Sequence, residues 1–252
     1  MAKKQEKTEL PSWIWLWLPL ALWLVPYIFT TFNKKLYEKI FFTEFGILEN
    51  ITLVFLIVGL IYSIKIVRLS SKSKKSSFDF NPRLIKIFFI LYALACFYFA
   101  GEEASWGMHF FGWEPSAEFL EAMPNKQGET NIHNMLDMRF RIFTNFLPHI
   151  LLTTSAIALG TIFPIVRKIG DIKFDPKSIW YWFMPTFLCV PSAALGAFVT
   201  MPKKLFRLFF EKPDLPAAYY AHQAESKETF LASFIMIFAL SFYYRMKTHL
   251  KA

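Results

Sequence analysis

The chemically reactive side chains of this sequence gather in two short stretches, GEEASWG and NKQGETNIHN. The first contains the adjacent carboxylates of Glu102 and Glu103, which can activate a water molecule by taking up its proton. In the second, Glu129 and His133 stand four residues apart, a spacing that places both on one face of a helix and allows them to hold a metal. These residue types predict hydrolysis or group transfer, with the four residues as catalytic groups.

Uncharged polar and aromatic side chains accompany these four groups, in a number that a simple spacer does not need. If the helix before them continues through the first stretch, Ser105 and His109 share one face with Glu102. The predicted substrate-binding residues are Ser105, Trp106, Asn125, Gln127, Asn131 and Asn134. The alternative interpretation is structural: a polar helix end with an aromatic belt, followed by a capped and solvated helix start.

Acidic residues also open two other apolar segments, in TEFGILEN and YYAHQAESKET. In the latter, His222 and Glu225 stand three residues apart, and Glu228 lies one step further along the same side of a helix. Many glutamates in a small volume repel one another unless protons, basic groups or a metal ion offset their charge. We therefore expect a divalent ion (Zn, Mg or Ca). Its predicted ligands are Glu49, Glu103, Glu129, His133, His222 and Glu225.

The rest of the sequence must hold these groups in a membrane. Of the 252 residues, 55% are hydrophobic and 19% are charged, whereas a soluble domain has about 25% charged residues. Apolar stretches suited to crossing a bilayer occupy residues 12–32, 45–64, 84–100, 142–166, 179–200 and 230–244. We expect an all-α polytopic protein in which residues 1–252 form one integral-membrane domain, a single bundle of six transmembrane helices.

Several classes of protein are excluded by what the sequence lacks. The two cysteines, Cys96 and Cys189, both lie in apolar segments and cannot build a disulfide framework or a thiolate zinc site. The common glycine-rich nucleotide-binding motifs and the GxSxG hydrolase motif are missing. A net charge of +9 suggests nucleic acid, but its distribution follows membrane topology. We therefore expect the lipid bilayer as a partner and no nucleic acid.

The basic residues predict the orientation of the chain. With the N-terminus inside, 17 of the 28 Lys and Arg residues fall on the cytoplasmic side, in agreement with the positive-inside rule. Both termini are then cytoplasmic, and residues 101–141 form a long outer loop. Because this loop is rich in aromatic as well as charged residues, we expect it to be partly ordered.

Two further expectations concern the helices. Pro185 and Pro191 predict a kink in the fifth segment. The second, third and sixth segments read as purely apolar beyond their outer turns, which confines the site to one side of the membrane. His149, inside the fourth segment, is interpreted first as a packed histidine bonded to a neighbouring carbonyl and second as a ligand.

The motifs GEE-x-SWG and N-x-QGE-x-N-x-HN, with an upstream E-x-G-x-x-E, resemble a family of bacterial polytopic inner-membrane proteins. Here the pattern falls at Glu44, Gly46, Glu49, Glu102, Glu103, Ser105, Trp106, Gly107, Asn125, Gln127, Gly128, Glu129, Asn131, His133 and Asn134. The resemblance implies a multi-pass protein of the bacterial cytoplasmic membrane with its site on the extracytoplasmic face, but no particular activity. His109 lies outside the shared pattern.

Two groups of membrane enzymes offer a chemical analogy. Alkaline ceramidases bind zinc with a Ser-x-x-x-His motif, whose spacing Ser105 and His109 share. However, Ser226 stands four residues after His222, where those enzymes have a further histidine. CAAX-type intramembrane proteases use paired glutamates, but their arginine and their final His-x-x-x-Asn have no counterpart in this chain.

We therefore expect an integral-membrane enzyme that acts on a lipid or lipid-linked substrate by hydrolysis or group transfer, as a metal-dependent hydrolase or transferase would. The alternative is a non-catalytic protein: a carrier that binds an ion or a proton, or an assembly partner of an envelope complex. Buried acids mark ion pathways as readily as active sites, so both classes start from the same residues.

Overall fold

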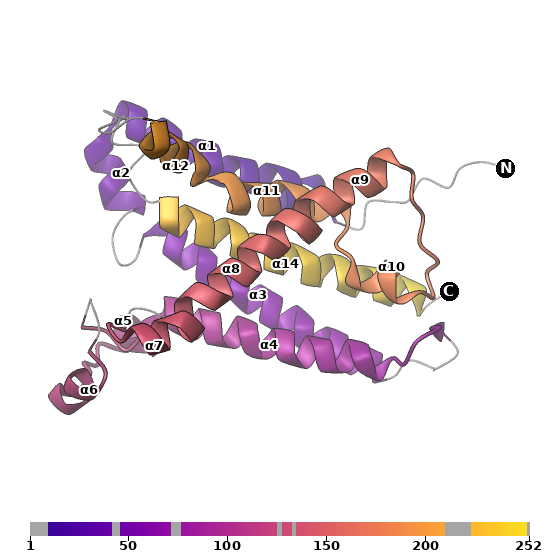
Figure 1. The fold of residues 1–252 in the computed structure, drawn as a ribbon, viewed down its shortest axis with the longest axis horizontal. Coiled ribbons are helices and arrows are strands. Elements are labelled where there is room, and N and C mark those ends of the chain that lie inside the picture. Colours follow the sequence, from indigo (N-terminus) through magenta and orange to yellow (C-terminus); the bar gives the residue numbers. More distant parts are fainter. Residues whose placement is uncertain are drawn as a thin grey trace.

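The computed structural model describes residues 10–41, 46–71, 77–124, 128–132, 135–209 and 223–250. Among these residues the regular structure is helical, with no strand, and six helices are long and apolar enough to cross a membrane (Figure 1). They are Trp13–Phe32, Ile47–Ser70, Arg83–Glu103, Ile142–Ile169, Ile179–Phe198 and Glu225–His249. The predicted all-α bundle of six transmembrane helices is confirmed.

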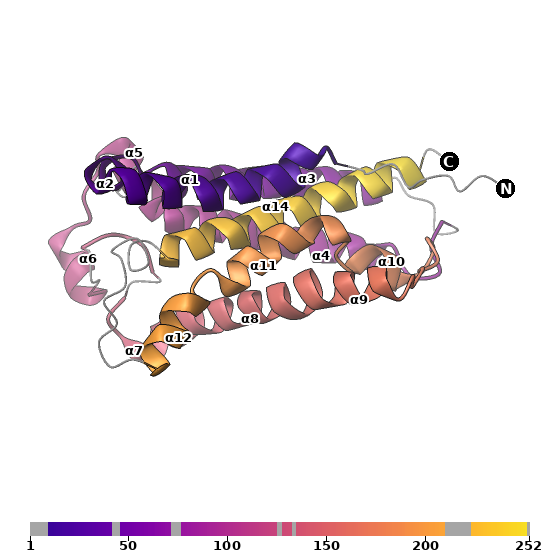
Figure 2. The same ribbon diagram turned by 90° about the horizontal axis from the view of Figure 1, so that it is seen from above.

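The two ends of the bundle differ in what they carry. The start of α1 (Leu18–Phe32) and the end of α14 (Gln223–His249) lie together at one end, which we call the terminal end (Figures 1 and 2). The opposite end, which we call the loop end, carries the short helices α2 (Lys34–Phe41), α5 (Met108–Phe111), α6 (Ala117–Ala122), α7 (Met138–Arg141) and α12 (Met201–Phe209). An even number of spans explains why α1 begins where α14 ends.

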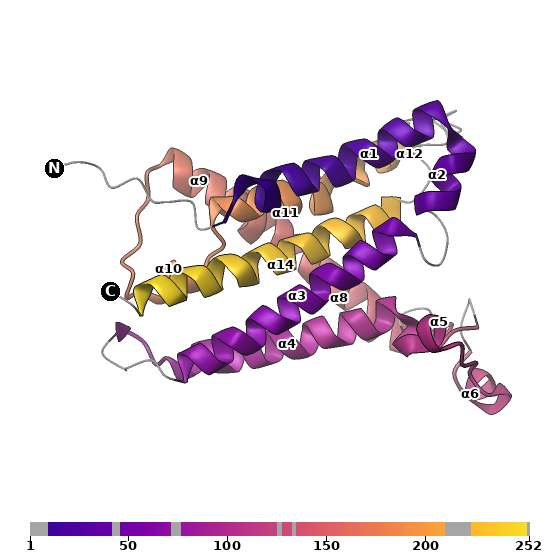
Figure 3. The ribbon, with the colours of Figure 1, turned by 180° about the vertical axis from the view of Figure 1, so that it is seen from behind.

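α14 is the central helix, running between α3 (Ile47–Ser70) and α11 (Val190–Phe198) (Figure 3). In its most apolar stretch 89% of the residues are buried, against at most 44% in any other span. Glycines on the neighbouring helices make room for it. A Cβ at Gly160 would lie 2.9 Å from the Phe234 ring, and one at Gly196 would lie 2.9 Å from Leu231. Small residues of this kind let helices in a membrane approach closely.

Three pairs of hydroxyl groups also join α14 to the rest of the bundle. They are Thr229 with Thr52 (2.8 Å), Ser233 with Ser192 (2.8 Å) and Ser241 with Thr186 (3.2 Å). Each buried hydroxyl thus has a partner, which removes the cost of leaving a polar group unsatisfied in an apolar interior. The expectation that the sixth segment is purely apolar beyond its first turns is therefore wrong.

Arg245 joins α14 to α10 (Ile179–Phe183) at the terminal end of the bundle. Its side chain is 4% exposed and donates hydrogen bonds to the backbone carbonyls of Tyr181 and, over 3.3 Å, of Trp182. The guanidinium lies 5.6 Å from the ring centroid of Phe242, a cation–π distance. This end is packed with aromatic rings, because Trp182 is fully buried against Phe242 and Phe78.

Three π-helical segments interrupt the spans, and each ends two residues before a proline. They are η1 (Trp13–Trp17) before Pro19, η4 (Ile142–Phe146) before Pro148 and η5 (Ala156–Ile162) before Pro164. Proline has no N–H, and its ring clashes with the carbonyl four residues earlier. A wider turn before the proline relieves that clash, so the helix continues as α8 (Leu147–Ser155) and α9 (Phe163–Ile169) without a break.

The predicted kink in the fifth span is confirmed as a complete break. α10 (Ile179–Phe183) stops at Met184, whose φ of −82° and ψ of 130° are extended. The next residue is Pro185, and a residue before proline avoids the helical region. The chain resumes as η6 (Phe187–Cys189) and α11, where Pro191 occupies the first turn, a position that needs no backbone donor.

Candidate functional site

The helix α4 (Arg83–Glu103) ends one residue before the chain turns back on itself. All three residues of η3 (Ser105–Gly107) have positive φ, of 43°, 53° and 90°. No right-handed helix passes through three such residues. The expectation that Glu102, Ser105 and His109 share one helical face is therefore wrong.

Trp106 folds back along the last turn of α4. Its indole nitrogen donates to Glu102 Oε1 over 2.7 Å, and its ring lies 6.1 Å from that of Phe97. A Cβ at Gly101 would come within 2.7 Å of the indole ring, so this position has room only for glycine. The GEEASWG stretch therefore builds a tight turn as well as carrying acids.

The segment 128–132 is fastened to this turn by two carboxylates. Glu102 Oε2 accepts the backbone N–H of Ile132 over 2.7 Å. Glu129 Oε2 accepts hydrogen bonds from Ser105 Oγ over 2.8 Å and from the Asn131 side-chain amide, and Thr130 Oγ1 donates to the Ser105 carbonyl over 2.5 Å. We call this group the clamp; its members are Glu102, Ser105, Trp106, Glu129, Thr130 and Asn131.

The members of the clamp are buried and hydrogen-bonded to one another. Apart from Trp106, its members are between 2% and 8% exposed, and each makes at least one hydrogen bond within the group. Residues 128–132 are not helical, and Gly128 has a φ of 71°. The expectation that Glu129 lies on a helix four residues before His133 is therefore wrong for the part of the chain that the structure describes.

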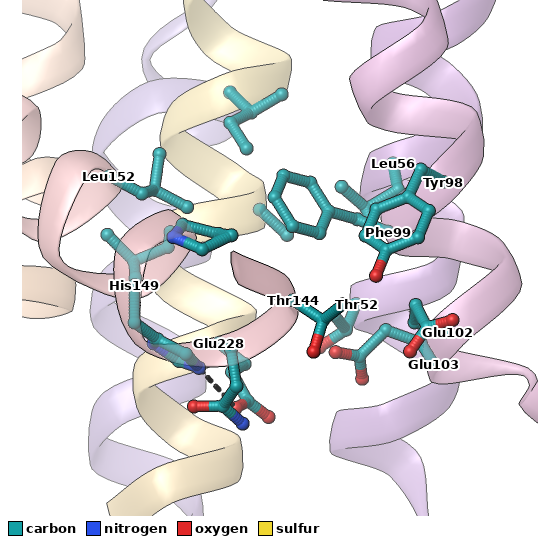
Figure 4. A pocket seen from close by; sticks show the side chains of 15 residues that line it. Thr52, Leu56, Tyr98, Phe99, Glu102, Glu103, Thr144, His149, Leu152 and Glu228 are labelled. Carbon is teal, nitrogen blue, oxygen red and sulfur yellow. Dashed lines mark ion pairs between the residues drawn. The ribbon is translucent and has the colours of Figure 1, made fainter. Parts of the chain in front are cut away.

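Beside the clamp, a pocket of about 70 Å³ lies at the loop end, between α3, α4, the η4–α8 segment and α14 (Figure 4). One part of its lining is polar: Thr52, Glu102, Glu103, Thr144, Asn145, His149 and Glu228. The other part is mainly apolar: Leu56, Phe99, Leu152, Leu231, Ala232 and Ile235. A pocket divided in this way fits a molecule with a polar head and an apolar tail.

His149 and Glu228 face each other across the pocket. His149 Nε2 lies 3.4 Å from Glu228 Oε1, and both side chains are about one-third exposed (Figure 4). His149 follows Pro148 at the start of α8, directly after the π-helical η4. The interpretation of His149 as bonded to a neighbouring carbonyl is therefore replaced by a pairing with an acid on another helix.

Glu103 brings the acids of three helices together. It points from α4 into the pocket and interacts electrostatically with Glu228 and Glu225 of α14, with Glu49 of α3 and with Glu102 (Figure 4). Like charges that interact disfavour one another, and protons, hydrogen-bond donors or a cation can offset this cost. Three of the predicted metal ligands, Glu49, Glu103 and Glu225, thus belong to one electrostatic group, whereas Glu129 belongs to the clamp.

Two buried threonines join α3 and α14 near these acids. Thr52 Oγ1 of α3 and Thr229 Oγ1 of α14 lie 2.8 Å apart, and Thr229 Oγ1 also donates to the Glu225 carbonyl over 2.9 Å. Thr52 is 3% exposed and Thr229 is fully buried. The distance between α3 and α14 at the level of the acids is therefore set by a hydrogen-bonded contact.

Several predicted site residues lie outside the described part of the chain. They are Glu44, Asn125, Gln127, His133, Asn134 and His222, and His109 is described in its backbone alone. Among the residues that the structure describes, no three His, Cys, Asp or Glu side chains are arranged to hold a metal ion. A divalent ion and its six predicted ligands therefore remain a prediction.

Most of the pocket residues are not among the predicted site residues, and three of these are ionisable: Tyr98, His149 and Glu228. The sequence holds a signal for His149, because an ionisable residue inside a membrane span is a functional-site hypothesis by default. Glu228 follows Glu225 on the same side of the sixth helix, which indicates its neighbourhood but no particular role. Tyr98 gives no signal, since its type and position match those of an ordinary aromatic belt.

No family model matches this chain, and neither a curated protein nor a solved structure matches it. The geometry of the pocket and of the clamp is thus the basis for a functional proposal.

Proposed function

We propose that the chain is an integral-membrane enzyme that hydrolyses a lipid or lipid-linked substrate, or transfers a group from it, in the pocket at the loop end. The observation that carries the proposal is the divided lining of this pocket. The reacting group would lie among Glu103, His149 and Glu228, and the hydrocarbon chain would lie against Leu152 and Ile235.

His149 and Glu228 together are suited to take a proton from a water molecule, with His149 as the general base. With the Nε2–H directed at the Glu228 carboxylate, Nδ1 carries the lone pair that can accept a proton. The carboxylate orients the ring and stabilises the imidazolium that forms when the proton is taken up. This arrangement supplies the activated water that hydrolysis requires, or activates a hydroxyl of an acceptor molecule for group transfer.

Glu103 is suited to bind or protonate the group that leaves. It enters the same pocket from α4, and its position depends on the clamp, because Glu102 is tied to Trp106 and to the backbone of Ile132. In this proposal Glu102 and Glu129 hold the end of α4 in place, and Glu103 acts on the substrate. The predicted divalent ion is one means of offsetting the charge of the acids.

The proposed location is the bacterial cytoplasmic membrane, with the loop end on the extracytoplasmic face. The distribution of 17 of the 28 basic residues on the opposite side supports this orientation. A cysteine placed at the exposed Ser116 should react with a membrane-impermeant thiol reagent added to intact spheroplasts. Reaction only after the membrane is opened would reverse the orientation.

An ion or proton carrier is the second candidate, and the buried polar residues of α14 are the observation that favours it. Ser233 and Ser241 lie eight residues apart, which is about 12 Å along a helix. The fully buried Ile237 lies between them, and each serine is bonded to a neighbouring segment. Because 12 Å is about four times the length of a hydrogen bond, this row of residues supports packing better than conduction.

Reconstitution in membranes tests the enzymatic proposal. Purified protein is placed in vesicles made from the total lipid extract of the expression host, and the lipids are followed by mass spectrometry over time. We expect one lipid class to be converted by the unaltered chain, and the conversion to be lost in His149→Ala and Glu228→Gln.

The matched control is Glu121→Gln, since Glu121 is an exposed acid of α6 and does not line the pocket. It should convert lipid at the rate of the unaltered chain. If His149→Ala and Glu228→Gln convert the same lipid at that rate, catalysis does not take place in this pocket.

A further inference from the structure

We infer that the pocket binds an ammonium group: the substrate's head is cationic rather than a phosphate. This inference rests on the proposed function and deepens it by naming the class of head group. It follows from three separate features of the pocket, which are its charge, an unsatisfied hydroxyl and two aromatic rings.

The charge of the lining favours a cation. The pocket is lined by Glu102, Glu103 and Glu228, and among the described residues no Lys or Arg lines it. Glu49 and Glu225 add their charge from outside the lining. Phosphate sites in proteins are built from Arg, Lys and backbone N–H groups, because an anion among carboxylates is repelled. A cationic head would instead offset the charge of the acids.

The hydroxyl of Tyr98 is the second feature. It is buried, has no hydrogen-bond partner among the described residues, and points toward the polar part of the pocket (Figure 4). A buried hydroxyl without a partner costs free energy, so an arriving group that satisfies it is stabilised. The Tyr98 oxygen can accept a hydrogen bond from an N–H of an ammonium.

Aromatic rings provide the third feature. Tyr98 and Phe99 both line the pocket, on the α4 side from which Glu103 also enters. The faces of such rings carry partial negative charge and attract ammonium ions, and this attraction grows where water is excluded. Rings and carboxylates on one wall form the usual environment of a bound ammonium group.

The apolar part of the pocket implies that this cation belongs to an amphiphile. Leu152, Leu231 and Ile235 belong to this apolar part of the lining. A hydrocarbon chain in contact with these residues leaves its head among Glu103, Glu228 and Tyr98. The bound molecule is therefore an amine-bearing lipid or lipid-linked compound.

Binding of four probes with one tail tests the inference without any turnover. Dodecylammonium, dodecyltrimethylammonium, dodecanol and dodecyl phosphate are titrated into the full chain in dodecyl maltoside micelles, followed by calorimetry. Titration into empty micelles gives the partitioning to be subtracted. We expect dodecylammonium to bind tightest and dodecyl phosphate weakest, with dodecanol between them, because only the head differs.

The variants should change this order in a specific way. Glu103→Gln should weaken dodecylammonium by about 10- to 100-fold, the range of a hydrogen bond to a charged group, and leave dodecanol unchanged. Tyr98→Phe should weaken dodecylammonium by about 2- to 10-fold and spare dodecyltrimethylammonium, which has no N–H to donate. Unchanged dodecanol binding also shows that each variant is folded.

Two outcomes overturn the inference: dodecyl phosphate binding as tightly as dodecylammonium, or a Glu103→Gln variant with an unaltered ratio of ammonium to alcohol affinity. Displacement of dodecylammonium by Mg²⁺, Ca²⁺ or Zn²⁺ would assign the acids to a metal and also overturns it. The proposed function fails separately. If the ammonium preference holds and no lipid is converted in vesicles, the pocket is a binding site and not an active site.

Discussion

Glu102 and Glu103 are adjacent in the sequence and both line the pocket, yet the contacts of their carboxylates differ. Glu102 lies in the clamp, where both of its oxygens accept hydrogen bonds, from Trp106 and from the backbone of Ile132. Glu103 lies in the pocket, among other glutamates and opposite His149. In the clamp, hydrogen-bond donors surround the carboxylate of Glu102. In the pocket, other carboxylates surround that of Glu103.

The difference separates acids whose contacts stabilise the fold from acids whose contacts do not. A buried carboxylate surrounded by donors lowers the free energy of the folded state, and its removal leaves those donors unpaired. A carboxylate surrounded by carboxylates raises that free energy, and such a cost persists where the group has a function. The two regions should therefore respond to mutation with opposite signs in stability.

The largest effect is expected for Glu103→Gln. Loss of a group that binds or protonates the substrate should lower the rate of lipid conversion by about 100- to 10,000-fold. Thermal unfolding in detergent should occur at the same or a higher temperature, because repulsion among the acids falls. A variant that is both inactive and clearly less stable would place Glu103 in the same class as the clamp.

A second effect, of opposite sign, is expected for Glu129→Ala. The hydroxyl of Ser105 and the amide of Asn131 would lose their buried acceptor, which should cost about 2–4 kcal/mol of unfolding free energy. Glu121→Ala, at an exposed position of α6, is the control and should cost less than about 0.5 kcal/mol. Equal losses in reversible denaturation would mean that the clamp contributes nothing to stability.

Two glycines test how far the clamp depends on its turn. Gly107 and Gly112 both have positive φ, of 90° and 65°. A Cβ at Gly107 would lie 2.9 Å from the Phe111 ring, whereas one at Gly112 would have nothing within 4 Å. Both alanine variants should lose about 1–2 kcal/mol through backbone strain, and Gly107→Ala about 1 kcal/mol more. If Gly112→Ala loses as much unfolding free energy as Gly107→Ala, the Phe111 ring moves away from the added methyl group at no cost.

The smallest effect concerns Tyr37 of α2, which is buried beside Phe41 and Leu48. Burial, with the neighbouring Glu225 carboxylate as the lesser cause, raises the pKa of Tyr37 to about 12. Since the unfolded value is about 10, the folded state keeps its proton longer, and the stability gained is complete below pH 10 and lost between pH 10 and 12. Near pH 11 the unaltered chain should therefore have lost about 1 kcal/mol of unfolding free energy, and the Tyr37→Phe variant should not show this loss.

A companion variant identifies the part due to charge. Glu225→Gln should lower the pKa of Tyr37 only partly, because burial is the larger cause. The measurement is the difference in tyrosinate absorbance between each protein and its Tyr37→Phe counterpart. An unchanged pKa of Tyr37 would show that the charge of Glu225 does not reach α2.

The spans can be predicted well from the sequence because the properties that define them depend on neighbouring residues alone. Twenty or so apolar residues cross a bilayer whatever surrounds them, and Pro185 prevents Met184 from being helical in any context. The π-helical turns before Pro19, Pro148 and Pro164 belong to the same class of local effect. The prolines alone do not predict them, however, because Pro26 lies inside α1 without such a turn before it.

The site is harder to predict because its geometry depends on distant partners. Ser105 adopts a positive φ that its residue type disfavours; its hydroxyl donates to Glu129 and its carbonyl accepts from Thr130. A helical continuation is the natural prediction when those contacts are unknown. For the same reason the spacing of Glu129 and His133 predicts a helix, although Glu129 bonds to Ser105 of η3 instead.

His149 shows the same dependence across helices. Its sequence neighbours are apolar, and nothing near it in the chain indicates a partner acid. Glu228 comes from the sixth span, and only the crossing of α8 over α14 brings the two within 3.4 Å. Which polar residues share a depth in the membrane could be inferred, but which ones meet could not.

The central position of α14 has a consequence for biosynthesis. A ribosome delivers spans to the membrane in sequence order, so five helices are inserted before the one that they all surround. Until then Gly196, whose neighbours within contact distance all belong to Leu231 of α14, lacks its packing partner. The first five spans therefore stay without their central helix until the last one is inserted. Because Glu228 lies on the same last helix, the lining of the pocket is completed in the step that completes the bundle.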